Sequence, residues 1–441
     1  MTAHVFCGPT LSPDQVLAAF PAAVPHPPIR HGDSLRLDVG PGDQVLIIDG
    51  VFHQAASVRH KEILALMAVG ATVAGCSSMG ALRAAELNVY GMIGVGEVYR
   101  KYKEGLLDAD ADVAVTHTQG PEVEQLTAAM VDLESHLLDA HLAGAVDGAE
   151  RAAIAAVLRE VHYTERSPQR LATLEAPGIA GFRSWLAEHP DLRGAKHRDA
   201  LTALRLLAEG AFQPTDPGAW VEQDWRTGHL AEWIDRHAGA VQGTRRISSL
   251  AQRQYQQIFD PDYPQRWRDR VLAWIAGEPS ADGCTASQLL ESAKRAAADS
   301  GLRVQDLTTE QRRRWLTAAE DATLDAGEAL GRLLVRSAGS GATPPGRDRP
   351  APPPDAATVE SVARAYSVND RAAALGVDVH RLEFGAVRRY LMQLWRLGES
   401  TTEECDAAAR DRGFRGFDGA VEVCRQFILA ELGEDLWRHL A

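Results

Sequence analysis

The stretch that decides the fold runs from Val45-Leu-Ile-Ile-Asp49 to Thr72-Val-Ala-Gly75. Its first segment is almost continuously aliphatic, as a strand covered on both faces of a parallel sheet should be. Between the two segments, apolar residues recur at near-helical spacing over 57–69, and Gly70 stands where a helix is expected to stop. The order strand, helix, strand predicts a right-handed βαβ unit, the building block of a parallel sheet.

Further strands and helices are predicted on both sides of this unit. His4-Val-Phe-Cys7 is short and apolar and precedes Gly8-Pro9, so it predicts another buried strand. A helix is expected over 80–90, directly after Cys76-Ser77-Ser78, where serine can cap it. Val113-Ala-Val115 predicts one more strand. The predicted fold class is α/β: a small parallel-sheet, Rossmann-like N-terminal domain followed by mostly α-helical regions.

Four regions are predicted along the chain. Its 441 residues exceed the size at which one hydrophobic core keeps growing, so several domains are expected. Residues 1–120 contain the predicted strands, and Ala-, Leu- and Arg-rich segments with a period near 3.6 predict a helical domain over 121–337. The composition of 338–354, with Gly-Ser-Gly and Pro-Pro-Pro, predicts a linker. Residues 355–441 are expected to form a small helical C-terminal domain, with its last helix over 427–440.

The overall composition narrows the classes of function. A net charge of −14 disfavours nucleic acid, because phosphate binding needs clustered Lys and Arg. The chain shows no signal-peptide pattern and no stretch near the roughly 20 apolar residues of a membrane-spanning helix. We therefore expect a cytoplasmic protein with no nucleic-acid or membrane partner. Its five cysteines lack C-x-x-C spacing, which predicts free thiols rather than a disulfide framework or a zinc site.

The topology predicts which polar residues meet. In an open parallel sheet the ligand crevice lies at the carboxyl ends of the strands. Three loops that follow predicted strands contain Thr10, then Asp49 and His53, and then Ser77 and Ser78, so we expect these residues at one edge of the sheet. A carboxylate at a buried strand end needs partners, and His53 is a natural one for Asp49.

Ser78 lies at a tight junction between a strand and a helix. There, backbone N–H groups and the positive end of a helix can hold a thiocarboxylate, a phosphate or an oxyanion. Gly80 permits close approach, but Cys76 occupies the first glycine position of the G-x-S-x-G nucleophile elbow, so that motif is incomplete. Helix capping alone explains Ser77 and Ser78 equally well.

Charged residues on the neighbouring helices complete the candidate set. Arg83 and Glu86 are three residues apart on one helix face and can pair, and the planar fork of Arg83 can also bind a carboxylate. His60 can act as a general acid or base, and Lys61 can neutralise an anionic substrate. A surface ion pair and a solvated helix face are the alternative interpretations of these residues.

No metal or nucleotide site is predicted on this chain. Gly91-Met-Ile-Gly94-Val-Gly96 lacks the order of a dinucleotide-binding motif, and no Walker-type motif occurs. Asp108, Asp110 and Asp112 precede His117, but an acidic turn explains this spacing better than a metal site does. Any ATP that the protein's reaction needs is therefore expected to bind elsewhere.

Four consecutive motifs resemble the TfuA-like family. They are Ile48-Asp-Gly-Val-Phe-His53, Ser57-Val-Arg-His-Lys-Glu-Ile-Leu64, Ser77-Ser-Met-Gly-Ala-Leu-Arg-Ala-Ala-Glu-Leu87 and Gly91-Met-Ile-Gly-Val-Gly96. The likeness extends from about Gly8 to His117, a quarter of the chain. It departs from the family at Arg59, where an aromatic residue is common, and at Cys76, where a small residue is commoner. Cys76 raises the idea of a persulfide carrier, against which stands the frequency of buried free thiols.

The resemblance implies a partnership with a YcaO enzyme in making peptide thioamides. YcaO enzymes use ATP to activate a backbone amide so that sulfide can replace its oxygen. TfuA-like proteins are implied to supply or steer that sulfur, and one way to do so is to release it from a thiocarboxylated sulfur-carrier protein. The implied partners are the YcaO enzyme, a ribosomally made precursor peptide and the carrier. ATP and magnesium would be bound by the YcaO enzyme, and no cofactor is expected on this chain.

On this hypothesis each candidate residue has a role. Ser78 and nearby N–H groups hold the thiocarboxylate, Arg83 and Lys61 offset its charge, and His60 or His53 moves a proton. Asp49 and Glu86 orient these groups. The catalytic candidates are His60, Ser78, Asp49 and Lys61, and the substrate-binding candidates are His53, Ser77, Arg83, Glu86 and Thr10.

Two alternative functions stay open at this point. A non-catalytic scaffold that activates the YcaO enzyme allosterically would still be required when free sulfide is in excess, whereas a delivery protein would not. A serine hydrolase with Ser78 as nucleophile is the third hypothesis, and the incomplete elbow argues against it.

Overall fold

The computed structural model describes residues 2–52, 55–118, 125–213, 219–222, 225–278, 281, 283–339 and 355–432. They form two compact units, 1–225 and 226–441. Most of the predicted linker and the end of the predicted last helix lie outside the described residues. The four predicted domain boundaries stay predictions. Within the described residues, every helix falls short of the length and hydropathy that a bilayer span requires.

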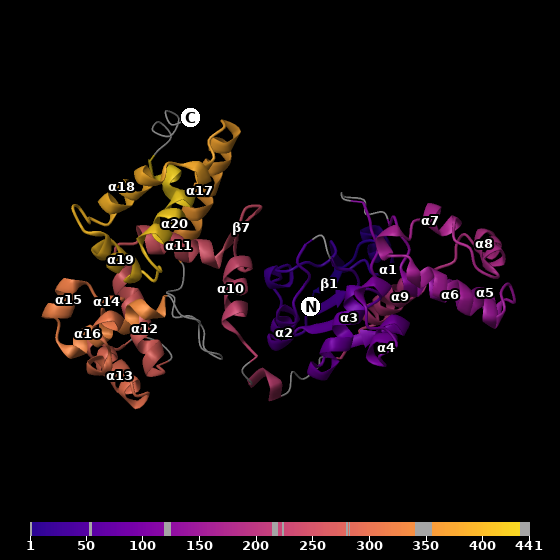
Figure 1. Ribbon diagram of the computed structural model, residues 1–441, viewed down its shortest axis with the longest axis horizontal. Helices are drawn as coiled ribbons and strands as arrows, with labels where there is room; N and C mark the ends of the chain where they lie inside the picture. Colours follow the sequence, from indigo (N-terminus) through magenta and orange to yellow (C-terminus); the bar gives the residue numbers. More distant parts are fainter. Residues whose placement is uncertain are drawn as a thin grey trace. The chain divides into compact units, whose positions relative to one another are not determined.

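A five-stranded parallel sheet forms the centre of the first unit (Figure 1). Its strand order is β2-β1-β3-β4-β5, and the strands are β1 (Ala3–Phe6), β2 (Ala23–His26), β3 (Gln44–Ile47), β4 (Thr72–Cys76) and β5 (Ile93–Val95). The predicted α/β class is therefore confirmed. The order changes direction between β1 and β3, and sheets of this order bind ligands beyond the carboxyl ends of the strands at such a switch point.

Helices cover both faces of this sheet. On one face α1 (Pro13–Ala19) and α9 (Ala195–Ala208) pack against strand residues such as Leu46 and Ala74. On the other face α2 (His60–Ala68) and α3 (Met79–Leu87) pack against the alternate strand residues, among them Ile47. Burial on both faces explains the continuous apolar run of β3. Because α9 comes from far along the chain, a distant segment completes the core of the sheet.

The remaining helices of the first unit extend from this core. α4 (Gly96–Lys103) follows β5 and packs against α3 and α9. A cluster of four helices shares its own apolar core: α5 (Met130–Leu142), α6 (Gly148–Glu160), α7 (Pro168–Ala172) and α8 (Ile179–Glu188). Short 3-10 helices are η1 (Ser34–Arg36), η2 (Asn88–Tyr90), η3 (Asp110–Asp112), η4 (Tyr163–Glu165) and η5 (Ala219–Glu222).

The prediction of a strand over Val113–Val115 is wrong. The segment follows η3 and has no regular structure, yet Val113 is fully buried and Ala114 nearly so. Val113 packs in a cluster with residues of α3, α4 and α5, so its apolar character reflects burial of an irregular segment. Strands β2 and β5 were not predicted from the sequence. Pro25 lies within β2 and Gly94 within β5, and both residue types are disfavoured in strands.

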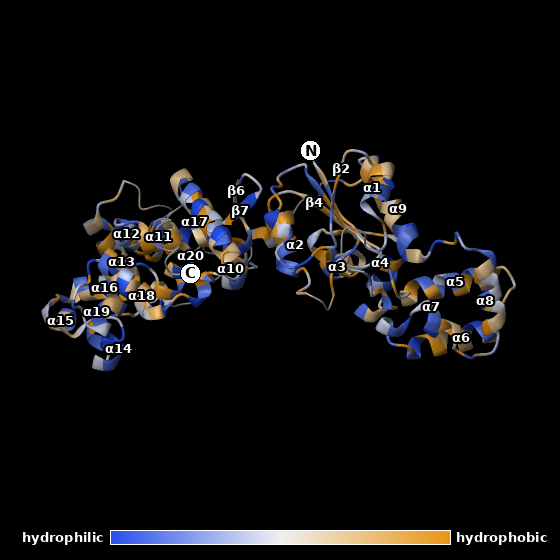
Figure 2. Ribbon diagram, turned by 90° about the horizontal axis from the view of Figure 1, so that it is seen from above, coloured by the Kyte–Doolittle hydropathy of each residue, from blue (hydrophilic) through white to orange (hydrophobic). Residues whose placement is uncertain are grey.

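The second unit is helical apart from one hairpin. The antiparallel hairpin joins β6 (Gly239–Gln242) to β7 (Arg245–Ser248). Its α-helices are α10 (Gly228–His237), α11 (Ser249–Phe259), α12 (Tyr263–Ala276), α13 (Ala286–Asp299), α14 (Thr309–Arg313), α15 (Ala318–Thr323), α16 (Ala326–Ala338), α17 (Ala356–Ala374), α18 (Phe384–Leu394), α19 (Thr402–Arg410) and α20 (Phe417–Leu432). Two 3-10 helices are η6 (Val304–Asp306) and η7 (Val379–Arg381). Figure 2 shows apolar and polar residues alternating along these helices, as amphipathic helices require.

A buried arginine links three helices of the second unit. Arg336 on α16 is 2% exposed and donates to Glu320 at 2.6 Å and to Asp411 at 2.8 Å. Although burial opposes the charge, hydrogen bonds to the two carboxylates raise the pKa of Arg336 above its usual range. The charged arginine therefore holds α15 and the end of α19 against α16.

Candidate functional site

Asp49 and Thr10 meet at the switch point of the sheet. Asp49 follows β3 and is 2% exposed, and Thr10 lies in the loop after β1. The backbone N–H of Thr10 donates to Oδ2 of Asp49 at 3.0 Å, and the Thr10 hydroxyl donates to Oδ1 at 2.6 Å. These two bonds give the buried carboxylate the partners it needs. The partner predicted for Asp49, His53, lies outside the described residues.

The turn after β4 is held in a conformation that few residues adopt. Ser77 has φ 67°, in the left-handed region where a side chain is strained. Two glycines let α3 approach the strands: a Cβ on Gly80 would lie 1.7 Å from the Ile47 carbonyl oxygen, and one on Gly75 would lie 2.1 Å from that of Gly80. The Ser77 hydroxyl is fully buried and donates to the Lys196 carbonyl at 2.7 Å. Ser77 therefore fixes the turn and lines neither cavity described below.

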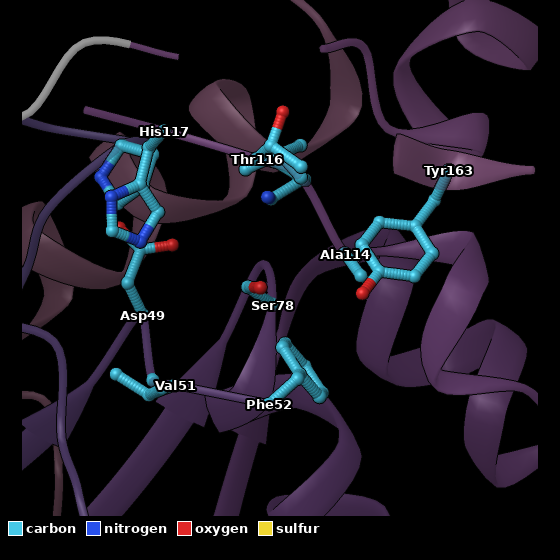
Figure 3. Close-up of a pocket in the computed structure, with 12 residues that line it drawn as sticks. Asp49, Val51, Phe52, Ser78, Ala114, Thr116, His117 and Tyr163 are labelled. Atoms are coloured by element: carbon cyan, nitrogen blue, oxygen red, sulfur yellow. The ribbon is translucent and has the colours of Figure 1, made fainter. Parts of the chain in front are cut away.

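Ser78 presents a free hydroxyl to a small cavity. It occupies the N-cap position of α3, but its side chain makes no capping bond, so the capping interpretation does not hold for it. The residue is 3% exposed and lines a cavity of about 50 Å³ together with Asp49. Figure 3 shows it between Asp49 and Phe52. No described residue hydrogen-bonds the Ser78 hydroxyl, so this hydroxyl is available to a molecule in the cavity.

Lys196 contributes a buried cation to the same cavity. It lies in the first turn of α9 and is 2% exposed. Its Nζ donates to the carbonyl of Val113 at 3.0 Å. Within the described part of the chain, no carboxylate lies within 4.0 Å of that nitrogen. A buried ammonium group without a counterion is costly, so the arrangement favours an anionic ligand.

The sequence did carry a signal for Lys196, which we did not predict. Lys196 and Asp199 share the periodicity of Ala200, Ala203 and Leu207, which form the buried face of α9. Charged residues in register with an apolar helix face are unusual and need partners. Asp199 has such partners, because it accepts hydrogen bonds from the backbone N–H groups of Glu97 and Val98 in α4. Lys196 instead faces the cavity.

The remaining wall of the small cavity comes from segments after the sheet. His117 and Thr116 follow the irregular segment at Val113, and Tyr163 comes from η4 (Figure 3). The Nδ1 atom of His117 lies 2.8 Å from the Thr118 carbonyl oxygen, which fixes the orientation of the ring. From the sequence, His117 was considered only as a possible metal ligand after the acidic turn, and it was not predicted as a residue of this site. Among the described residues, no three His, Cys, Asp or Glu side chains gather closely enough to hold a metal ion.

A second cavity adjoins the first. It measures about 320 Å³, and Pro9 and Lys196 line both cavities. Its other walls come from the β1–α1 loop, from α5 and from the loop before α9; they include Thr10, His136 and Arg193. The two cavities thus share Lys196 as a common wall. Asp132 of α5 accepts a hydrogen bond from the Lys196 backbone N–H at 2.9 Å and so caps α9 at this point.

Besides Ser77, four of the predicted site residues line neither cavity. His60, Arg83 and Glu86 form a cluster across α2 and α3: His60 Nε2 and Arg83 Nη1 lie 2.8 Å and 2.6 Å from Glu86 Oε2. The predicted Arg83–Glu86 pair is therefore confirmed. Burial raises the pKa of Glu86, but the hydrogen bonds from His60 and Arg83 outweigh it and lower that pKa overall. Lys61 donates instead to the carbonyl of Trp225 at 2.6 Å.

Cys76 is a buried thiol rather than an accessible one. It is fully buried at the end of β4, and burial raises the pKa of its thiol. Only the thiolate is a strong nucleophile, so a raised pKa makes the group inert. This position does not favour a persulfide carrier.

The geometry suits the binding of a small anion beside a carboxylate. Lys196, the free Ser78 hydroxyl and the positive end of α3 favour negative charge, and Asp49 stands beside them with lone pairs left for a water molecule. No described histidine hydrogen-bonds Ser78, so the described residues do not contain the Ser–His pair of a serine hydrolase.

Residues 49–167 match the family model described as TfuA-like protein. The predicted resemblance is therefore confirmed over this segment. The match includes Asp49, Ser78 and His117, whereas Thr10 and Lys196 lie outside it. No curated protein matches the chain.

Proposed function

We propose that this protein works with a YcaO enzyme in forming backbone thioamides in a ribosomally made peptide. Its part is to release sulfide from a thiocarboxylated sulfur-carrier protein in the cavity at the end of the sheet. The match of residues 49–167 to the TfuA-like family supports the partnership. The observation that carries the chemistry is the unpaired, buried ammonium group of Lys196 beside the free hydroxyl of Ser78.

The reaction is a hydrolysis that needs no other reactant. The oxygen of a water molecule attacks the carbonyl carbon of the thiocarboxylate, and the bond between that carbon and sulfur breaks. The carrier is left with an ordinary carboxylate, and the sulfur leaves as hydrogen sulfide with both protons of the water. Asp49 accepts one proton from the attacking water and returns it to the leaving sulfur. Lys196 and Ser78 stabilise the negative charge that develops on the carbonyl oxygen.

Sulfide release by the purified chain tests this function. A thiocarboxylated carrier is mixed with the protein, and sulfide is measured with a fluorogenic probe. We expect Asp49→Asn to slow release about 100-fold or more, because a general base is lost. Ser78→Ala is expected to slow it about tenfold, as loss of a hydrogen bond to a charged group would. Asp108→Asn, at an exposed position outside the cavities, is the matched control. Unchanged rates in both site variants would refute the assignment.

A reconstituted thioamidation reaction separates delivery from activation. With the YcaO enzyme, its peptide and ATP present, we expect excess free sulfide to make this protein dispensable. Mass spectrometry of the peptide gives the readout, since replacement of oxygen by sulfur changes its mass. If the protein is still required at saturating sulfide, it acts as an allosteric activator and the delivery function is wrong.

A further inference from the structure

The two adjoining cavities point to a ligand larger than a free anion. We infer that the 320 Å³ cavity binds the C-terminal main chain of a polypeptide, whose terminal anionic group passes Lys196 and enters the smaller cavity. The inference rests on the proposed function, since it names the part of the carrier that the site recognises. It extends that function by assigning a second binding site to residues of α5 and α9.

The two cavities adjoin at Pro9 and Lys196, which line both of them. The proposed chain passes these two residues between the larger cavity and the smaller one. The smaller cavity measures about 50 Å³, which leaves room for a terminal carboxyl or thiocarboxyl group. The larger cavity is several times that size, and a small free anion would leave it unused.

Charge favours an anionic chain end at the junction of the cavities. Lys196 is buried there with a backbone carbonyl as its hydrogen-bond acceptor. Arg193 lines the larger cavity at an exposed position, and no carboxylate of the described residues lies within ion-pairing distance of it. Asp132 is the acidic residue in the described wall, and one of its oxygens is engaged with the N-terminus of α9.

Polar groups in the larger cavity suit a main chain. The Nε2 atom of His136 is buried and has no hydrogen-bond partner among the described residues. Burial lowers the pKa of His136, so its ring is neutral at pH 7 and offers one donor and one acceptor nitrogen. Gln125 adds an amide to the same wall. An extended main chain supplies N–H and C=O groups in alternation, which side chains of this kind can satisfy.

Peptide binding tests the inference without any sulfur chemistry. The probe is the tetrapeptide Ala-Ala-Gly-Gly with fluorescein at its N-terminus and a free carboxylate, and its Kd is measured by fluorescence anisotropy on the full chain. We expect the C-terminal amide to bind at least tenfold more weakly, because it lacks the charge that Lys196 faces. A peptide ending in leucine should also bind at least tenfold more weakly, because its side chain does not fit beside the small cavity.

Two variants locate the peptide. Lys196→Met should weaken binding of the acid at least tenfold and abolish the preference for acid over amide, whereas Lys103→Met, at an exposed site on α4, should change neither. His136→Phe should weaken binding of the tetrapeptide and leave binding of the dipeptide Gly-Gly unchanged, because only the longer probe reaches α5. This second variant tests the cavity even where the buried lysine position does not tolerate methionine.

The outcomes of this experiment and of the sulfide assay are independent. The inference is overturned if the acid and the amide bind equally well, or if the tetrapeptide binds no more tightly than the dipeptide, even if sulfide is released. Tight, Lys196-dependent binding of the acid supports the inference even if no sulfide is released, a result that would instead refute the proposed function.

Discussion

The hydroxyl of Ser77 donates to the main-chain carbonyl of Lys196, 119 residues further along the chain. This bond ties the turn after β4 to the first turn of α9. The turn carries Ser78 and the helix carries Lys196, so the bond holds together the two segments that bring the hydroxyl and the cation to one cavity. The positive φ of Ser77 is what turns its side chain toward α9 rather than into the cavity.

Replacing Ser77 therefore separates backbone strain from hydrogen bonding. Ser77→Ala and Ser77→Gly both lose the bond to Lys196, but only glycine adopts φ 67° without strain. We expect the glycine variant to be more stable than the alanine variant by about 1 kcal/mol, the reverse of the usual order. Urea unfolding of the two variants gives the comparison. Greater stability of the alanine variant would show that the turn relaxes in solution.

Thr10 holds the proposed base in place. Thr10→Val keeps the shape of the side chain but removes the hydroxyl that donates to Asp49. The carboxylate then loses one of the two hydrogen bonds that orient it, so sulfide release should slow about tenfold. The free energy of unfolding should fall by about 1.5–3 kcal/mol, as expected for a hydrogen bond to a charged group. Thr10→Ser, which retains a hydroxyl, should restore the rate. An unchanged rate in the valine variant would mean that this bond does not position Asp49 for the reaction.

A histidine pair makes the stability of the first unit depend on pH. His4 Nδ1 lies 2.9 Å from His26 Nε2 across β1 and β2, and burial lowers the pKa of both rings. The folded chain thus resists protonation that the unfolded chain accepts below about pH 6.5. Stability should be full above that pH and fall as the pH drops toward the folded-state pKa values.

Thermal unfolding at pH 7.5 and at pH 5.5 checks this expectation. The Tm of the wild type should fall between the two conditions by more than that of the double variant His4→Gln, His26→Gln. The variant keeps polar side chains but cannot titrate. Equal falls in Tm would assign the pH dependence to other groups, such as His136.

Arg336 should be a large contributor to the stability of the second unit. Arg336→Met leaves Glu320 and Asp411 without their buried partner, so we expect a loss of about 3–5 kcal/mol in the free energy of unfolding. Arg332→Met is the matched control, because Arg332 also contacts Asp411, at 3.2 Å, from a more exposed position. That variant should cost about 0–1 kcal/mol. Similar losses in the two variants would contradict the role given to burial.

Local patterns predicted the part of the fold that depends on neighbours in sequence. β3, α2 and α3 follow from apolar spacing and from glycines at their ends, and the Arg83–Glu86 pair follows from helix geometry. The position of Asp49 and Ser78 at one sheet edge follows from parallel topology. These inferences need no knowledge of residues beyond about 100.

The rest of the site depends on contacts that spacing does not encode. Lys196 lines the same cavity as Ser78 only because α9 covers the sheet, and nothing local to either residue signals that they are neighbours. The switch point between β1 and β3 depends on β2, a strand hidden by Pro25. His60 and Lys61 begin α2, and Ser78 precedes α3 on the same face of the sheet. The side chains of His60 and Lys61 nevertheless hydrogen-bond Glu86 and the Trp225 carbonyl, away from the cavity.

The late position of α9 has a consequence for synthesis on the ribosome. A nascent chain that has reached residue 194 already contains all five strands, yet one face of its sheet is covered by α1 alone and still lacks α9. The apolar residues that α9 covers stay open to solvent or to chaperones until the next segment emerges. Lys196 arrives with that segment, so the nascent protein gains the cation of its proposed site at the same moment as it closes its core.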